Sequence, residues 1–140
     1  MDKKFWIAGA IASIILALYS FIAHGLLLHA DHHELPDHYR SGAEVHTFFP
    51  FLLVTYLVKG FAFAWIYRQG ISQGVPWLSQ GVMFGIAAVL LITIPFYLNN
   101  YATQPLPGTF VAKQIVFDTV GMILTAVAVA FINRSSVESI

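Results

Sequence analysis

The segment from Phe5 to Leu28 reads FWIAGAIASIILALYSFIAHGLLL and contains no lysine, arginine or carboxylate. About 20 apolar residues are enough for a helix to cross the hydrocarbon core of a bilayer. Three more apolar segments of that length follow, so the predicted spans are 5–28, 46–67, 78–98 and 110–132. The sequence therefore predicts an all-α integral membrane protein with four antiparallel transmembrane helices.

Composition supports this fold class. The chain has 140 residues, of which 58% are hydrophobic and 10% charged, and its mean hydropathy is +0.73. A soluble domain of this size could not cover its surface with so few charges. Little sequence lies outside the spans, so we expect a single domain over residues 1–140. The first apolar segment is too long for the core of a secretory signal, so we expect an uncleaved helix.

Charge and cysteine content narrow the function classes. The formal net charge is zero, which gives no support to nucleic-acid binding. The chain has no cysteine, which excludes disulfides, thiolate metal sites and thiol catalysis. There is no Gly-x-Ser-x-Gly elbow and no glycine-rich phosphate loop in a strand-to-helix context. An enzymatic role is therefore left open but not favoured.

The distribution of lysine and arginine predicts the orientation in the membrane, because cytoplasmic loops carry an excess of both. With both termini inside, the cytoplasmic side holds Lys3, Lys4, Arg68 and Arg134, against Arg40 and Lys113 outside. Tryptophan and tyrosine favour membrane interfaces; the inner belt would be Trp6, Trp65 and Trp77, and the outer Tyr39, Tyr97, Tyr101 and Phe110. We expect a protein of the bacterial inner membrane whose first long loop is periplasmic.

That first loop is rich in histidine. All six histidines lie between His24 and His46. Imidazole and carboxylate side chains bind divalent transition metals such as zinc, copper or iron. The predicted ligands are His24, His29, His32, His33, His38 and His46, with Asp31, Glu34 and Asp37 as ligands or hydrogen-bond acceptors. Their spacing matches no established metal motif. A solvated loop and a pH-responsive cap stay open as alternatives.

Small residues at helical spacing predict which helix faces touch. Such faces allow close helix approach in lipid. The predicted contact stripes are Gly9, Ser13, Ala17 and Ser20; Gly81, Gly85 and Ala88; and Gln114, Asp118, Gly121, Thr125 and Ala128. His24 falls on the first stripe at about 100° per residue, so we expect it to point into the bundle.

Two further sites are predicted inside the membrane. His24 and His46 are the histidines at span ends, so together they could ligate a single b-type haem. Lys59 and Asp118 are charged residues within spans, and their predicted depths differ by about 7–8 Å. We expect an ion pair between them, with a proton or ion relay, or an unpaired Lys59 reaching the interface, as alternatives.

Two function classes follow. The first is a small membrane protein whose outer histidine–carboxylate cluster binds a divalent metal for handling or delivery. The second is a non-catalytic accessory or assembly subunit of a larger membrane complex. Both have the lipid bilayer as a partner, and the second adds other membrane subunits.

Overall fold

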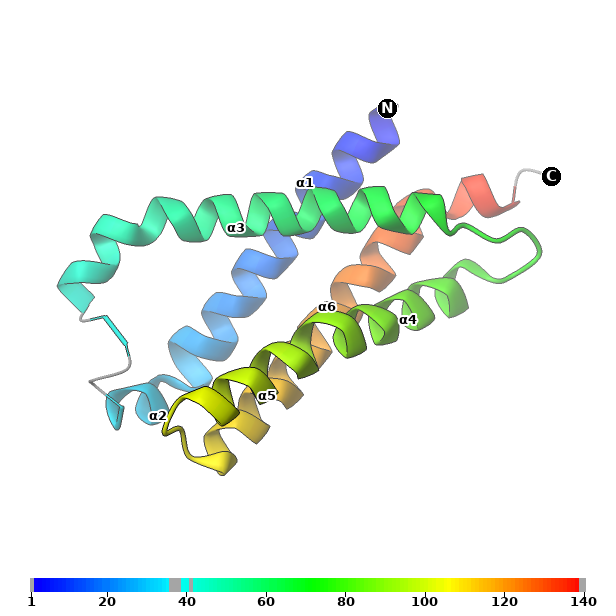
Figure 1. Cartoon of the computed structure of the whole chain (residues 1–140). Coiled ribbons are helices and arrows are strands. Elements are labelled where there is room, and N and C mark those ends of the chain that lie inside the picture. Colours follow the sequence, from blue (N-terminus) through cyan, green and yellow to red (C-terminus); the bar gives the residue numbers. More distant parts are fainter. Residues whose placement is uncertain (1, 36–38, 41, 139–140) are drawn as a thin grey trace.

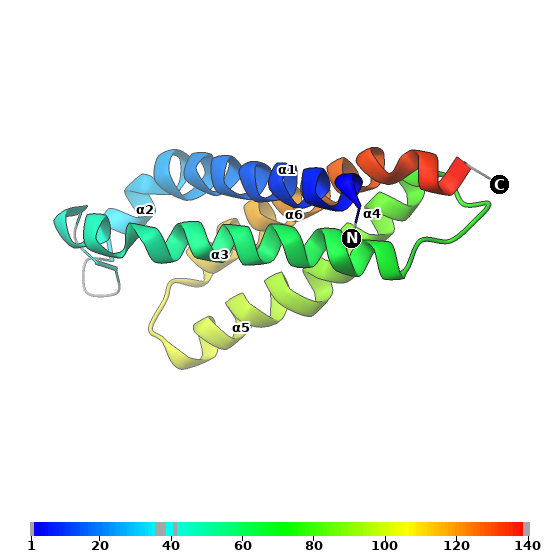
Figure 2. The same cartoon turned by 90° about the horizontal axis from the view of Figure 1, so that it is seen from above.

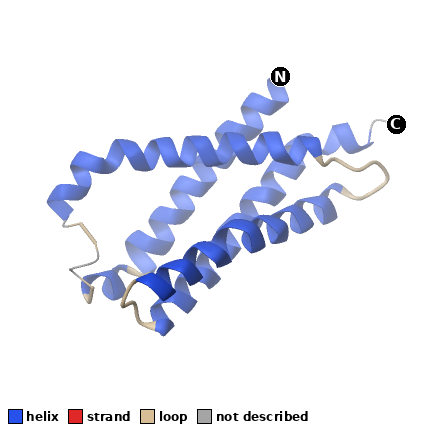
Figure 3. Ribbon diagram, viewed as in Figure 1, coloured by secondary structure: helices blue, strands red, loops and turns tan. Residues whose placement is uncertain are grey.

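The computed structural model describes residues 2–35, 39–40 and 42–138, and all regular structure in these residues is helical (Figures 1 and 3). Predicted Asp37 and His38 lie outside the described residues. The helices are α1 (Lys3–Ser20), α2 (His29–His33), α3 (Gly42–Gln69), α4 (Trp77–Ala88), α5 (Ile94–Thr103) and α6 (Gly108–Glu138). Two π-helical segments, η1 (Phe21–Leu27) and η2 (Val89–Thr93), continue α1 and join α4 to α5.

Among the described residues, four helices are long and apolar enough to cross a membrane, in agreement with the four predicted apolar segments. They are Lys3–Leu27, Glu44–Gln69, Trp77–Thr103 and Gly108–Ser135, with mean hydropathies of 2.2, 1.7, 2.2 and 2.3. The two termini and the α3–α4 connection lie at one end of the bundle, and α2 and the α5–α6 connection lie at the other (Figure 1). Successive spans therefore run in opposite directions.

The small-residue stripes are contact faces, as predicted. A Cβ atom added at Gly60 of α3 would lie 2.2 Å from the Ser13 hydroxyl oxygen of α1. A Cβ added at Gly85 of α4 would lie 2.9 Å from the Ile123 Cα of α6. Helix α1 contacts both α3 and α6, and α4 contacts α6 (Figure 2). Glycine at these positions lets the helix backbones touch, which supplies the close packing that holds helices together in lipid.

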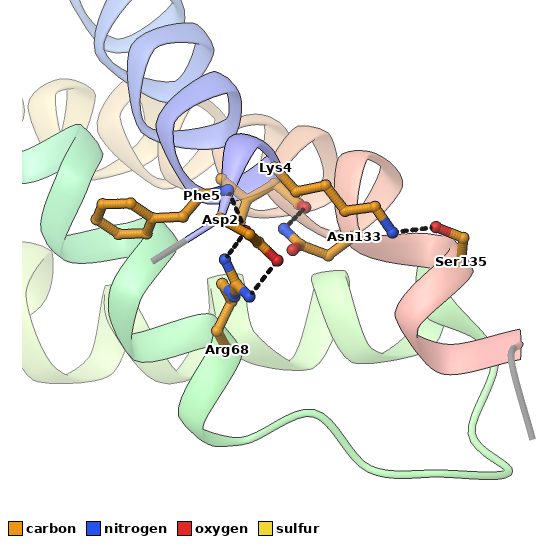
Figure 4. Close-up of polar contacts among 7 residues, drawn as sticks. Asp2, Lys4, Phe5, Arg68, Asn133 and Ser135 are labelled. Atoms are coloured by element: carbon orange, nitrogen blue, oxygen red, sulfur yellow. Dashed lines mark hydrogen bonds and ion pairs between the residues drawn. The ribbon is translucent and has the colours of Figure 1, made fainter.

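Polar contacts hold the end of the bundle that carries the termini (Figure 4). Both terminal nitrogens of the Arg68 guanidinium donate to the Asp2 carboxylate, which also accepts from the Phe5 amide at the start of α1. The guanidinium, and next to it the amide, hold the pKa of the Asp2 carboxyl at about 2, below its ordinary 3.8. Lys4 donates to Ser135 of α6. These contacts link α1 to α3 and α6.

Helix α3 is the least embedded span. Between residues 44 and 59 every side chain is exposed except that of Tyr56, and α3 diverges from the other helices toward its first residue (Figure 1). The buried residues of α3 begin at Gly60 and continue with Phe63, Ala64 and Tyr67. One end of α3 is thus packed against the bundle, while its first half is exposed.

Candidate functional site

A polar cluster inside the bundle is centred on Asp118 of α6. The Nε2 atom of His24, in η1, lies 2.9 Å from the Asp118 Oδ1 atom. The Tyr97 hydroxyl, on α5, donates to Asp118 Oδ2 at 2.5 Å. Tyr97 is only 6% exposed, and the side chains of His24 and Asp118 are 24% and 28% exposed. Both carboxylate oxygens are therefore engaged, by residues from two different helices.

The cluster forms part of the wall of a cavity of about 460 Å³. Residues from all four spans line it, and its apolar wall consists mainly of Leu16, Leu52, Ile92, Phe96 and Met122. Its other polar residues are Tyr19, Ser20, Thr55, Tyr56, Lys59 and Thr93. The Tyr56 hydroxyl donates to the Ser20 hydroxyl oxygen at 2.7 Å, which joins α3 to α1 at the cavity. The site combines a mostly apolar surface with a few converging hydrogen-bonding groups.

Both π-helical segments border this cavity. Segment η1 carries His24, and η2 contributes Ile92 and Thr93 to the wall. Pro95 follows η2 closely; because it has no N–H group, it cannot donate to the carbonyl four residues earlier, and this weakens α-helical bonding there. Short π-helical turns occur frequently at functional sites. The local backbone thus departs from α-helix next to the polar cluster in two separate spans.

Lys59 lies on the cavity wall with Leu52 and Thr55 of the same helix. Among the described residues, the direct contacts of the Asp118 carboxylate are to His24 and Tyr97, and no ion pair joins it to Lys59. The two predicted partners therefore share a cavity without direct contact. The inward direction of His24 agrees with the sequence analysis.

Four of the predicted histidines form two ring pairs: His24 with His32, whose centroids are 5.8 Å apart, and His29 with His33. His29 and His33 face each other on α2, with their Nε2 atoms 3.2 Å apart. The Nδ1 atom of His32 donates to the Leu28 carbonyl oxygen at 2.7 Å. The His32 ring also packs between two aromatic rings, and its centroid lies 4.6 Å from that of Tyr39 and 5.1 Å from that of Phe110. Burial lowers the pKa of the His32 imidazole below its ordinary 6.5. Burial therefore favours the neutral form of this ring relative to a solvent-exposed imidazole.

The remaining predicted ligands are spread over the end of the bundle that carries α2. Asp31 forms an ion pair with Lys113 of α6 at 2.7 Å, and Glu34 is exposed. His46 is exposed on α3 and does not line the cavity with His24, so the cavity does not bring the two predicted haem ligands together. Within the described part of the chain, no three histidine or carboxylate side chains gather into a group able to hold a metal ion.

Tyr97 was not expected in the site. The sequence places it in an outer aromatic belt, together with Phe110, and that prediction is wrong for both residues, which are 6% and 2% exposed. Tyr97 packs inward because its hydroxyl group has a carboxylate acceptor within the bundle. The signal that could have indicated this is its position, several residues inside the end of a span that faces Asp118 on the neighbouring helix.

Comparisons of the chain with protein-family models, with curated proteins and with solved structures gave no match. No relative therefore supplies roles for these residues. Their chemistry has to be inferred from their geometry.

Proposed function

We propose that this chain is a small inner-membrane binding protein whose cavity takes a lipid-soluble small molecule with a polar head group. The observation that carries the proposal is the His24–Asp118–Tyr97 cluster in the wall of a cavity lined by all four spans. Ionisable residues within a membrane span are costly, and they commonly mark a substrate or ion pathway.

The size and lining of the cavity indicate the kind of ligand. Small-molecule sites measure roughly 300–1,000 Å³ and are mostly apolar with a few polar groups that orient the ligand. The volume of about 460 Å³ is within that range. Lys59 on the cavity wall is a hydrogen-bond donor, so it favours a head group that carries oxygen acceptors. The apolar wall would hold the rest of the molecule.

The way in is from the side, through the bilayer. Leu52 of α3 and Phe96 of α5 both line the cavity, and they are 43% and 57% exposed. Helix α3 diverges from the bundle over the same stretch. A molecule dissolved in the lipid could therefore reach the polar cluster between α3 and α5 without crossing the head-group region.

Ligand retention tests this proposal. Protein purified in mild detergent is extracted with organic solvent, and the extract is analysed by mass spectrometry. We expect a defined small molecule near one per chain, reduced by about tenfold or more in Asp118→Asn, because a buried polar group that loses its partner costs about 1–3 kcal/mol. The matched control is Asp31→Asn, which removes a carboxylate paired with Lys113 at the outer end.

Lys59→Met gives a second variant that leaves the contacts of Asp118 in place, and it too should lower retention. The same mixture of bulk lipids in wild type and all variants would refute the proposal. A tightly bound membrane subunit with no small molecule would favour the accessory role instead.

For the topology, we propose that both termini are cytoplasmic and that α2 is periplasmic. The excess of lysine and arginine at the end with the termini supports this orientation. Because the chain has no cysteine, single cysteines at Ser72 and Glu34 can report the side of each end. In intact cells with a permeabilised outer membrane, we expect a maleimide that cannot cross the inner membrane to label Glu34→Cys only. Labelling of Ser72→Cys alone would reverse the orientation.

Metal handling is the second candidate function, and the observation that favours it is the convergence of His29 and His33 on α2. This candidate concerns the outer end of the bundle and does not depend on the cavity.

A further inference from the structure

Two imidazoles at the outer end of the bundle already have the separation that a bound metal requires. The Nε2 atoms of His29 and His33 are 3.2 Å apart, and the ring centroids are 4.4 Å apart. Metal–nitrogen distances of about 2.0–2.1 Å in tetrahedral geometry put two ligand nitrogens about 3.3–3.4 Å apart. An ion placed between these two nitrogens would therefore need only a slight shift of the rings.

We propose that His29 and His33 are the protein ligands of a surface site for a divalent transition metal, with water completing the coordination. The assignment rests on the second candidate function and specifies its ligands. The two residues are one helical turn apart on α2, so the helix holds the pair together before the metal arrives. Both side chains are exposed, so an ion reaches them directly from water.

The other described histidines have different environments. His24 lies against Asp118 in the cavity wall, and His32 is bound to the Leu28 carbonyl between two aromatic rings. His46 is exposed on α3, on a different element from the pair. Asp31, on α2 itself, is paired with Lys113. Among the histidines that the structure describes, His29 and His33 thus form the pair whose ring nitrogens converge at the surface.

The chemistry of the pair also indicates which metal to use as a probe. Neutral imidazole is a borderline ligand, and Cu²⁺ binds such sites most strongly among the divalent first-row ions. Each Nε2 atom must be free of a proton to bind the metal, so each neutral ring would carry its hydrogen on Nδ1, and protonation of either ring to imidazolium would compete with the metal. Metal binding should therefore weaken as the pH falls.

The test is titration of the full-length protein in detergent with Cu²⁺ at neutral pH, with electron paramagnetic resonance to count nitrogen ligands. Loss of one of two linked ligands removes the advantage of the second binding event, so His29→Ala or His33→Ala should each weaken binding about a hundredfold. The double variant should bind more weakly than either single variant, because it keeps neither imidazole ligand. His46→Ala is the matched control, because it removes an exposed histidine from another helix, and its affinity should stay within about twofold of wild type.

The possible results distinguish the assignment of His29 and His33 as ligands from the metal-handling function on which it rests. Tight Cu²⁺ binding that survives both single changes, or that falls equally in His46→Ala, would overturn the assignment of the pair while leaving metal handling in place. No binding by the wild-type protein would overturn both. Neither result would affect the ligand of the cavity, which is measured separately by retention.

Discussion

Replacing Gly60 by alanine is expected to destabilise the bundle strongly by pushing α1 away from α3. The added Cβ would lie 2.2 Å from the Ser13 hydroxyl oxygen, 2.5 Å from the Ser13 backbone nitrogen and 2.8 Å from the Gly9 carbonyl oxygen. Two of these atoms belong to the backbone of α1 and cannot rotate away. Overpacking of this kind costs about 1–3 kcal/mol of unfolding free energy, and we expect the upper end of that range.

The sign of the effect makes this test informative. Alanine is a better helix former than glycine by about 1 kcal/mol, so an unpacked site would be stabilised by the same change. Gly70→Ala is the control, because the nearest atom to its added Cβ is the Tyr67 carbonyl oxygen at 4.0 Å. Reversible unfolding in mixed detergent measures both variants. Equal stability of Gly60→Ala and Gly70→Ala would contradict the close contact between α1 and α3.

Removing the Asp118 carboxylate is expected to have the other large effect. Asp118→Ala leaves the His24 ring and the Tyr97 hydroxyl without their acceptor inside the bundle. An unsatisfied buried polar group costs about 1–3 kcal/mol, although measured couplings between side chains in membrane proteins average about 0.6 kcal/mol. We therefore expect Asp118→Ala to lower the unfolding free energy by about 1–3 kcal/mol.

Double-mutant cycles identify which partner matters. The coupling of Asp118→Ala with Tyr97→Phe should exceed its coupling with Lys59→Met, because Tyr97 touches the carboxylate and Lys59 only shares the cavity. The control within this design is the Tyr56→Phe change, which removes a hydroxyl that bonds to Ser20 instead of Asp118. A stronger coupling of Asp118 with Lys59 than with Tyr97 would instead support the Lys59–Asp118 ion pair that the sequence predicts.

The fold could be predicted to a large extent from the sequence, because span length and small-residue spacing are local properties. The Gly81 and Gly85 stripe faces α6, as its spacing indicates. The ends of the helices could not be predicted from hydropathy. Helix α3 begins at Gly42 and α6 continues to Glu138, because helical turns at the ends of a span can be polar. The π-helical segments were also missed, since they depend on packing between spans.

The site was only partly predictable. His24 shares a helical face with Ser13, so its inward direction followed from the sequence. The contact between His24 and Asp118 did not follow from the sequence, because counting residues from the span ends pairs Asp118 with Lys59. Such counting ignores the angles at which helices cross and the direction in which side chains point. The sequence also could not show that the His24 and His32 rings, eight residues apart, contact each other with centroids 5.8 Å apart yet have different hydrogen-bond partners, Asp118 and the Leu28 carbonyl oxygen. That difference arises where η1 ends and α2 begins.

Because of the two π-helical segments, the number of residues in a span can change without a change in the path of the helix. A π-helical turn accommodates an additional residue while the rest of the helix keeps its course through the bilayer. Loss of one residue from η1 or η2 would leave enough apolar chain to cross the membrane but would turn neighbouring positions by about 100°. Single-residue insertions and deletions at these two places are therefore a route by which related chains could acquire different ligands while keeping the same four-helix frame.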